Sequence, residues 1–338
     1  MSESNAVIFG CSGLTLTADE RAFFAESRPW GFILFGRNIA DRLQIADLVA
    51  ALRDSVGRPD APILIDQEGG RVQRLKPPLV PQYPAGADLG ALYESNRGAG
   101  LRAAWIMSRL HAFDLHPLGI TVNCLPVLDV PVPGAHQVIG SRAYGPSAET
   151  VAQMGRAAAD GLKAGGMLPV IKHVPGHGRA NADTHFELPV VTASRAELSA
   201  RDFVPFKALR GEAMAMSAHV VFAAIDPASP ATTSAVTIDE IIRGEIGFDG
   251  LLMSDDVSMN ALSGDVATRT RAIITAGCDV TLHCNGVRSE MEAVASATPA
   301  LAGNALRRAN AVLAAFGMPD DSSEAGLRSE FEGLMAAS

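Results

Sequence analysis

The chain has 338 residues, with 28 Lys and Arg against 37 Asp and Glu, so its formal net charge is −9. Hydrophobic residues make up 48% and charged residues 19%, which is typical of a folded globular protein and unlike a disordered polymer. The acidic balance argues against nucleic acid and anionic membranes as partners, because both select basic surfaces. Composition therefore favours a small neutral or weakly charged ligand.

The sequence shows neither a targeting signal nor closely spaced cysteines. The N-terminus lacks the basic start and the long apolar run of a signal peptide, and no stretch of 18 apolar residues occurs anywhere. We therefore expect a cytoplasmic protein that is not inserted in a membrane. Cys11, Cys124, Cys278 and Cys284 stand singly, without the close spacing of metal or redox sites, and are expected to be buried thiols.

Short apolar runs, each followed by a polar loop and a helix-like segment, recur along the chain. They are AVIFG (6–10), GFILFG (31–36), PILID (62–66), ITVNCLPVLDV (120–130), MLPVIKH (167–173), AMAMSAHV (213–220), LLMSDD (251–256) and CDVTLHCN (278–285). Continuous apolar runs are typical of parallel strands covered on both faces. Eight such alternations predict an α/β fold, a (β/α)8 barrel of the TIM type, with a doubly wound open sheet as the alternative.

The helical segments between the runs have recognisable faces and ends. Two of them carry apolar residues at helical spacing: Ile45, Val49 and Leu52, and Val151, Met154, Ala158 and Leu162. Ser194 and Glu197 form a capping box, and Gly277 is placed to end a helix. We expect one catalytic barrel over 1–318 and a polar C-terminal helix or tail over 319–338.

Polar residues gather at what would be the carboxyl ends of the strands. They are Asp66, Asn123, Asp129, Lys172, His173, His219, Asp255, Asp256, His283 and Asn285. In a barrel these side chains face one common cavity, so the pattern indicates a site at that end. Asp255 and Asp256 are adjacent on one predicted strand and must point opposite ways. One can therefore face the cavity as a nucleophile while the other caps the next segment or fixes the backbone.

The stretch IKHVPGHGRANADTHFELP (171–189) places three histidines, an aspartate and two glycines on a predicted loop. A metal site is one interpretation, but the histidine spacings match no helical metal motif. The other is a dyad in which Asp183 holds Nδ1 of His185 and leaves Nε2 for proton transfer. Gly176 and Gly178 can adopt backbone angles closed to other residues, which predicts a mobile catalytic loop after the fifth strand.

Five motifs together carry a resemblance to a known family. IDQEGGRVQR (65–74), IGSRAYG (139–145), IKHVPGHG (171–178), DTH (183–185) and LMSDDVSM (252–259) occur in this order. The chain resembles the family 3 glycoside hydrolases, and within them the cytoplasmic β-N-acetylglucosaminidases of bacterial cell-wall recycling. The resemblance runs from the first strand to about residue 285. It departs from the common motifs only at Val174, where Phe is common, and at Thr184, where Ser is common.

The resemblance implies a retaining hydrolysis within a barrel fold. Asp255 would be the nucleophile and His185, partnered by Asp183, the general acid and base. Contacts to N-acetylglucosamine are implied for a further set of residues: Asp66, Arg74, Arg142, Lys172 and His173. It also implies action on cell-wall muropeptide fragments such as GlcNAc-1,6-anhydro-MurNAc, by a monomer or weak homo-oligomer that needs no cofactor and no metal.

Several other functions stay open on the residues alone. Phosphorolysis is allowed, since an imidazole acid–base does not repel phosphate as a carboxylate would. The 2-acetamido oxygen could replace Asp255 as nucleophile and leave it an orienting role. A metal-dependent hydrolase built on the histidine loop and a non-catalytic sugar-binding barrel complete the alternatives.

Overall fold

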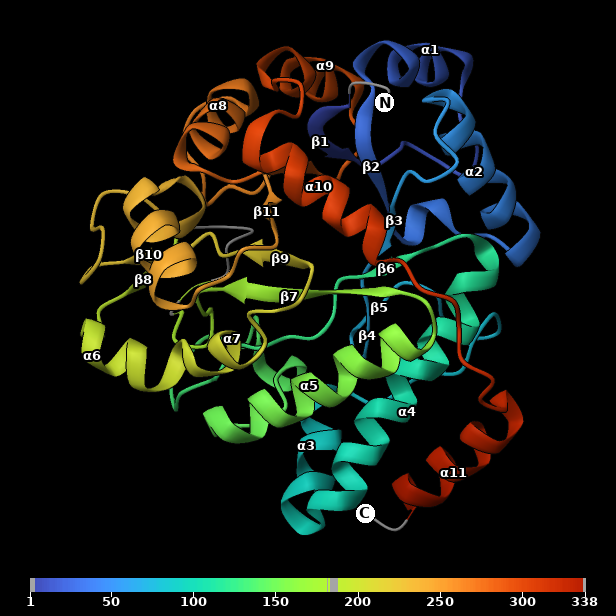
Figure 1. Cartoon of the computed structure of the whole chain (residues 1–338), viewed down its shortest axis with the longest axis vertical. Helices are drawn as coiled ribbons and strands as arrows, with labels where there is room; N and C mark the ends of the chain where they lie inside the picture. The colour runs from blue at the N-terminus through green and yellow to red at the C-terminus, as the bar shows by residue number, and fades with distance from the viewer. Residues whose placement is uncertain (1–3, 181, 183–187, 337–338) are drawn as a thin grey trace.

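The computed structural model describes residues 4–180, 182 and 188–336. Within them, parallel strands close a barrel in the order β1-β12-β11-β9-β7-β6-β3-β2 (Figure 1). The barrel strands are β1 Asn5–Phe9, β2 Pro29–Leu34, β3 Ile63–Ile65, β6 Val122–Asn123, β7 Leu168–Val174, β9 Met214–Ser217, β11 Leu251–Asp256 and β12 Val280–His283. Each predicted run supplies one of them. The closed barrel is therefore confirmed, and the open-sheet alternative is wrong.

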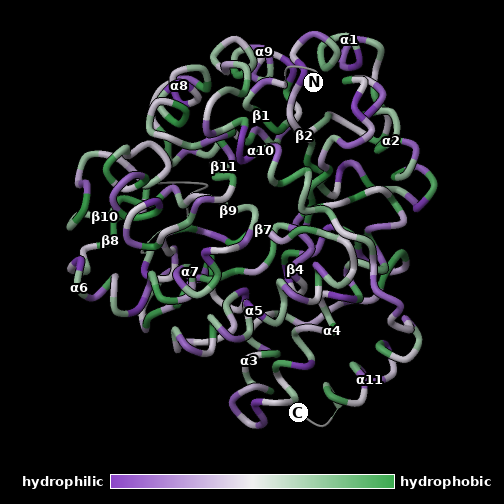
Figure 2. Tube along the Cα trace, in the orientation of Figure 1, coloured by the Kyte–Doolittle hydropathy of each residue, from purple (hydrophilic) through white to green (hydrophobic). Residues whose placement is uncertain are grey.

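Helices connect the strands and surround the barrel. The α-helices are α1 Ala18–Ser27, α2 Arg42–Ser55, α3 Gly86–Ser95, α4 Arg97–Leu115, α5 Ala148–Ala164, α6 Arg195–Glu197, α7 Val204–Ala208, α8 Val266–Ala276, α9 Arg288–Ala297, α10 Gly303–Ala315 and α11 Glu324–Ala336. Two π-helical segments, η4 Leu198–Asp202 and η6 Thr237–Glu245, and short 3-10 turns, η1 Gly36–Asn38, η2 His116–Leu118, η3 Gly140–Arg142 and η5 Ala231–Thr233, complete the helical set. In Figure 2 hydrophobic and hydrophilic segments alternate along these helices, as expected for helices buried on one side.

Two smaller pairings lie outside the barrel. Strands β4 Gln67–Gly69 and β5 Val72–Gln73 pair in antiparallel fashion directly after β3, while β8 Val190–Val191 pairs in parallel with β10 Val221–Phe222. Both pairings are separate from the barrel sheet, and β4 and β10 come soon after barrel strands β3 and β9 in the chain.

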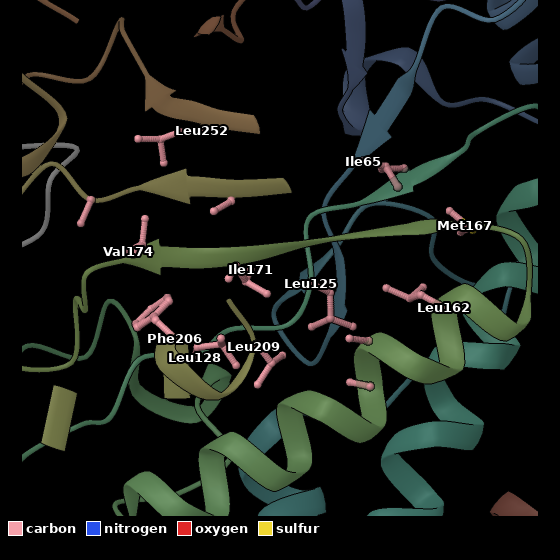
Figure 3. Packing of buried hydrophobic residues seen from close by; sticks show 14 of the residues in the cluster. Ile65, Leu125, Leu128, Leu162, Met167, Ile171, Val174, Phe206, Leu209 and Leu252 are labelled. Carbon is pink, nitrogen blue, oxygen red and sulfur yellow. The ribbon is translucent and has the colours of Figure 1, made fainter. Parts of the chain in front are cut away.

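Alternation along each strand separates two apolar layers. Ala6 and Ile8 of β1 belong to the cluster inside the barrel, whereas Val7 and Phe9 pack outward against the helices. Figure 3 shows the outer layer at β7, where Ile171 lies over Leu125, Leu128 and Leu162 in the space between β7 and α5. This period of two fixes which side chains at the strand ends turn inward.

The amino ends of the strands are closed by packing. Ala309 and Val312 of α10 belong to the inner cluster together with Trp30, which lies near the start of β2. Beyond it, α11 lies beside α4 at the periphery (Figure 1), where Leu327 and Phe331 are buried. The amino end of the barrel is therefore occupied, and the carboxyl end is left for a site.

The predicted helix features are present with one difference. The apolar faces of α2 and α5 are buried, Gly277 ends α8 in the left-handed conformation, and the Ser194–Glu197 capping box forms. That box opens only the short helix α6, which continues as a π-helix from Leu198. Among the described residues, no helix is long and apolar enough to cross a membrane. All four cysteines are free and buried, as expected.

Candidate active site

A cavity of about 310 Å³ opens at the carboxyl ends of the barrel strands. Its described lining comprises Ile33, Phe35, Asp66, Arg71, Val72, Arg74, Val138, Ile139, Arg142, Lys172, His173, His177, Met216, Asp255, Asp256, Met259, Leu282 and Cys284. Six predicted site residues are among them: Asp66, Arg74, Arg142, Lys172, His173 and Asp255. Asp183 and His185, the predicted acid–base pair, lie outside the described residues. The structure thus gathers every predicted site residue that it describes.

Strand register aims Asp255 at the cavity. Leu251 and Met253 of β11 belong to the inner cluster, so Asp255 follows on the same inward face. On two other barrel strands the same parity turns Asp66, which follows β3, and Lys172 of β7 inward. The floor of the cavity is therefore formed by the inward-facing side chains at the carboxyl ends of the barrel strands.

The carboxylate of Asp256 accepts hydrogen bonds from two backbone amides and one hydroxyl group. Its Oδ1 accepts hydrogen bonds from the Ser258 amide at 3.1 Å and the Cys284 amide at 3.2 Å, and its Oδ2 accepts one from the Ser258 hydroxyl at 2.7 Å. Its own carbonyl contacts Nε2 of His219 at 3.0 Å. Asp256 also touches the cavity, but its hydrogen bonds fix the turn after β11. Asp255 is consequently the better placed of the two to react.

Charged groups beside Asp255 form a continuous network. Asp66 accepts from Lys172 at 3.0 Å and from Arg74 at 2.8 Å. Lys172 also contacts Glu68 at 2.6 Å, and Glu68 receives Nε and Nη2 of Arg142 at 2.8 Å each. The paired two-point geometry of Arg142 fixes its orientation. The network holds the cationic groups rigidly along one wall of the cavity.

This network keeps its acids ionised. Burial alone would raise the pKa of Asp66, but Lys172 and Arg74 hold it well below the usual range. Burial likewise opposes ionisation of Glu68, and Arg142 with Lys172 lowers its pKa to about 2. The acids in turn raise the pKa of Lys172 and of Arg142 against their burial. All four groups are charged at neutral pH.

Arg142 has an acidic partner that the sequence motifs did not point out. The family resemblance implied only a sugar contact for Arg142, yet Arg142 pairs with Glu68, which was not singled out. The charge count offered a signal: three cations beside one carboxylate leave an excess of positive charge that needs a second acid. Glu68 stood two residues beyond Asp66 in the same motif.

Asp129 organises the start of the loop that follows β7. Its Oδ2 accepts from Nδ1 of His173 at 2.7 Å, while Oδ1 accepts from the backbone amides of His173 at 3.2 Å and His177 at 2.6 Å. The side chain is fully buried; burial opposes its ionisation, yet the imidazoles of His173 and His177 lower its pKa to about 2. Nε2 of His173 is left for a ligand in the cavity.

His177 lies in the cavity wall. Burial lowers its pKa to about 4, against the nearby charge of Asp129, so the ring is neutral at pH 7. Burial opposes ionisation of Asp255 as well, but His219, His173 and the Asp256 amide bring the pKa of Asp255 below its usual value. Asp255 is thus an anion at neutral pH, as a nucleophile must be.

Two details of the loop differ from the sequence interpretation. Residues 171–174 belong to β7, so the loop begins at Pro175. Gly176 has φ +141°, which favours glycine, whereas Gly178 has ordinary angles and is required because a Cβ there would lie 2.2 Å from the carbonyl oxygen of Val130. Close packing, not conformational freedom, therefore explains Gly178.

A metal cluster does not form among the described residues. Within 4–180, 182 and 188–336, no three His, Cys, Asp or Glu side chains are grouped so that they could hold an ion. The thiol of Cys284 lines the cavity, but burial raises its pKa far above the usual value. The described part of the site offers the carboxylate of Asp255 and the charged groups beside it.

The fold, the acidic side chain on the inward face of β11 and the charged wall together define a class of protein. Residues 13–310 match the family model for the glycosyl hydrolase family 3 N terminal domain, and the chain belongs to this family. It is an enzyme of the β-N-acetylhexosaminidase type within that family.

Named relatives support this placement. A β-hexosaminidase of Methylococcus capsulatus is 40% identical over 282 residues, which span 82% of this chain and 82% of that protein. One from Pseudomonas aeruginosa is 38% identical over 299 residues, or 86% of each chain. The crystal structure of NagZ from Neisseria gonorrhoeae in complex with N-trifluoroacetyl-D-glucosamine matches with a TM-score of 0.85 and 30% identity, covering 99% of this chain and 97% of that one.

Proposed function

We propose that the protein is a retaining exo-glycosidase that removes β-linked N-acetylglucosamine from the non-reducing end of its substrate. One observation carries the proposal: Asp255 and the described residues expected to bind the sugar all line a single cavity. That cavity has about 310 Å³, near the lower limit for ligand pockets, which suits one terminal sugar ring better than the interior of a polysaccharide.

In the proposed mechanism Asp255 attacks C1 of the sugar and forms a covalent glycosyl ester. The bond from C1 to the leaving oxygen breaks, and protonated His185 transfers its proton to that oxygen. Neutral His185 then takes a proton from water, the resulting hydroxide attacks C1, and the carboxylate of Asp255 is released. Asp183 would keep Nδ1 of His185 in place during both steps.

In this scheme the charged network of Asp66, Glu68, Arg74, Arg142 and Lys172 binds and orients the sugar. Carboxylates accept hydrogen bonds from sugar hydroxyls, whereas guanidinium and ammonium groups donate to them. Asp66 held between Lys172 and Arg74 therefore recognises a pair of hydroxyls in one orientation, with C1 turned toward Asp255. Nε2 of His173, fixed through Asp129, adds a further contact from the same side.

The physiological substrate is proposed to be a cell-wall muropeptide fragment such as GlcNAc-1,6-anhydro-MurNAc, encountered in the cytoplasm. Support comes from the motif resemblance to the enzymes of cell-wall recycling and from the N-acetylglucosamine analogue in the related Neisseria structure. In such a fragment N-acetylglucosamine is the non-reducing end, as a cavity for one ring requires.

The nucleophile is tested by covalent capture. Turnover of 4-nitrophenyl N-acetyl-β-D-glucosaminide should disappear in Asp255→Ala, and a slowly hydrolysed 5-fluoro analogue of N-acetylglucosamine should leave its label on the peptide that contains Asp255. Asp256→Asn provides the matched control, whose adduct must still be on Asp255. A label on Asp256, or none with full activity, would refute the assignment.

Two further measurements separate the alternatives. Dialysis against EDTA should leave activity unchanged; a loss restored by metal would indicate a metal-dependent hydrolase. Products formed with and without phosphate should be the free sugar in both cases, and N-acetylglucosamine 1-phosphate would indicate phosphorolysis.

A further inference from the structure

A second cavity, of about 380 Å³, adjoins the first at the same end of the barrel. Its described lining is Gly36, Ile39, Ala40, Arg71, Gln73, Arg74, Lys76, Pro77, Pro78 and Leu79. Arg71 and Arg74 line both cavities, so the two spaces meet at these guanidinium groups. The lining comes from the segments after β2 and β3, whose strands carry Phe35 and Asp66 of the first cavity at their ends.

The second cavity is cationic in a protein whose net charge is −9. Arg71, Arg74 and Lys76 line it, and none of its described lining residues is acidic. Arg74 is paired on its far side with Asp66, and Arg71 donates to the carbonyl groups of Gln137 and Val138. In the described part of the chain no carboxylate lies within ion-pair distance of Lys76, which is exposed. The positive charge of this cavity is therefore left for a ligand.

The rest of the lining is shaped to hold an organic group beside that charge. Ile39, Pro77, Pro78 and Leu79 supply an apolar floor, and the fixed backbone of proline keeps it in place. The amide of Gln73 is already used, since it donates to the carbonyls of Leu75 and Pro81 and accepts from the Tyr83 amide. Cations over an apolar floor select a molecule that carries a carboxylate on a compact carbon skeleton.

We propose that this second cavity is the leaving-group site and that Lys76, with Arg71, makes the enzyme prefer leaving groups that bear a carboxylate. The inference rests on the proposed glycosidase function, because the first cavity must hold the sugar for the second to hold what departs from it. A carboxylate seated there lowers the energy of the bound substrate and of the transition state alike. It therefore changes KM more than kcat.

Two chromogenic substrates, one charged and one neutral, provide the test. One is 3-carboxy-4-nitrophenyl N-acetyl-β-D-glucosaminide and the other is its methyl ester, which is similar in size. The ester group withdraws electrons from the ring more strongly than the carboxylate, so intrinsic reactivity favours the ester and opposes the expected preference for the acid. At low ionic strength the protein should show kcat/KM about threefold to tenfold higher for the acid, through a lower KM, and added salt should erase the difference.

Substitutions at Lys76 locate the preference. Lys76→Gln should remove the advantage of the acid while changing kcat/KM for the ester by less than about twofold, and Lys76→Glu should make the acid the poorer substrate. Arg210→Gln removes the same charge from the exposed loop before β9, at the other end of the barrel, and should keep the preference. That control excludes a general effect of net charge.

The outcomes distinguish this inference from the function on which it rests. Turnover of the ester with no preference for the acid would overturn the leaving-group site and leave the glycosidase function standing. A preference that persists in Lys76→Glu would likewise overturn it. Failure of both substrates to turn over would overturn the proposed function, and the inference with it.

Discussion

Asp129 and His173 are joined by a buried hydrogen bond of 2.7 Å between Oδ2 and Nδ1, at the junction of two neighbouring barrel strands and the loop that follows them. The same carboxylate holds the backbone amides of His173 and His177, so one side chain fixes both the imidazole and the turn beneath it. Although no part of Asp129 lines the cavity, the orientation of a cavity residue depends on it.

We expect Asp129→Asn to lower kcat/KM for an aryl N-acetyl-β-glucosaminide by about tenfold to a hundredfold, because a charged hydrogen bond of roughly 1.5–3 kcal/mol that orients His173 is lost. The larger share should appear in KM if His173 binds the sugar equally in ground and transition states. Steady-state kinetics of the folded variant measure both quantities.

The control for this variant is Asp114→Asn. Asp114 is also buried and pairs with Arg328 at 2.7 Å, but it belongs to α4 and its partner to α11, and it does not line the cavity. It should cost stability and leave kcat/KM unchanged. Equal effects of the two variants on kcat/KM would mean that Asp129 acts through general stability alone.

Local rules were sufficient for much of the site. The alternation of a strand predicted that only one of Asp255 and Asp256 faces inward, although the family resemblance was needed to choose Asp255, and the runs of apolar residues predicted the closed barrel. These features depend on neighbours within a few residues, which is the range over which a sequence pattern determines geometry.

Features that join distant segments were not predictable in the same way. Arg142 and Glu68 are 74 residues apart in the chain and meet only when η3 folds over the β4–β5 hairpin. Likewise, the run 120–130 gives a barrel strand of only two residues, and its later part meets β7 through an isolated bridge between Val127 and Lys172. Such pairings depend on the tertiary fold, which the sequence pattern does not specify locally.

Low pH should reduce the free energy of unfolding, because it protonates Glu68 in the charged network of the cavity. Glu68 has a pKa of about 2 in the folded state against an ordinary value of 4.5, so its contribution is complete above pH 4.5 and is lost as the pH falls toward 2. Glu68→Gln should therefore lower the free energy of unfolding by roughly 3–5 kcal/mol at pH 7. The gap from the original protein should shrink steadily below pH 4.5.

Urea unfolding followed at pH 7, 5 and 3.5 measures that gap. Glu26→Gln, on the exposed side of α1, is the matched control and should give no difference at any of these pH values. A gap for Glu68→Gln that stays constant with pH would show that packing, and not ionisation, accounts for its effect.

The pH dependence of catalysis should separate the nucleophile from the acid–base group. The pKa of Asp255 lies below 3.8, so this group stays ionised and sets no acid limb in kcat/KM between pH 4.5 and 7. The alkaline limb should belong to His185, whose unperturbed pKa is about 6.5. His185→Ala should remove that limb and reduce turnover by about 10² to 10⁴.

A 2,4-dinitrophenyl leaving group needs no proton and provides the control, because with it His185→Ala should slow formation of the glycosyl-enzyme little. Profiles of kcat/KM between pH 4.5 and 9 for the original protein and His185→Ala show which group sets each limb. An acid limb near pH 6 that survives in His185→Ala would contradict the ionised state assigned to Asp255.

Close packing at Gly178 makes a final prediction about how the catalytic loop is anchored. A Cβ there would lie 2.2 Å from the oxygen and 2.3 Å from the carbon of the Val130 carbonyl, and neither backbone atom can move without shifting the segment that carries Asp129. Gly178→Ala should therefore cost about 1–3 kcal/mol of stability. It should also lower kcat/KM, because the displaced backbone carries both Asp129 and the start of the loop.

Gly211→Ala is the control, because no atom lies within 4 Å of the added Cβ, and it should change neither the stability nor kcat/KM. Thermal unfolding and aryl-glycoside kinetics on the two variants test this, and a Gly178→Ala protein with unaltered stability and rate would show that the Val130 segment yields freely.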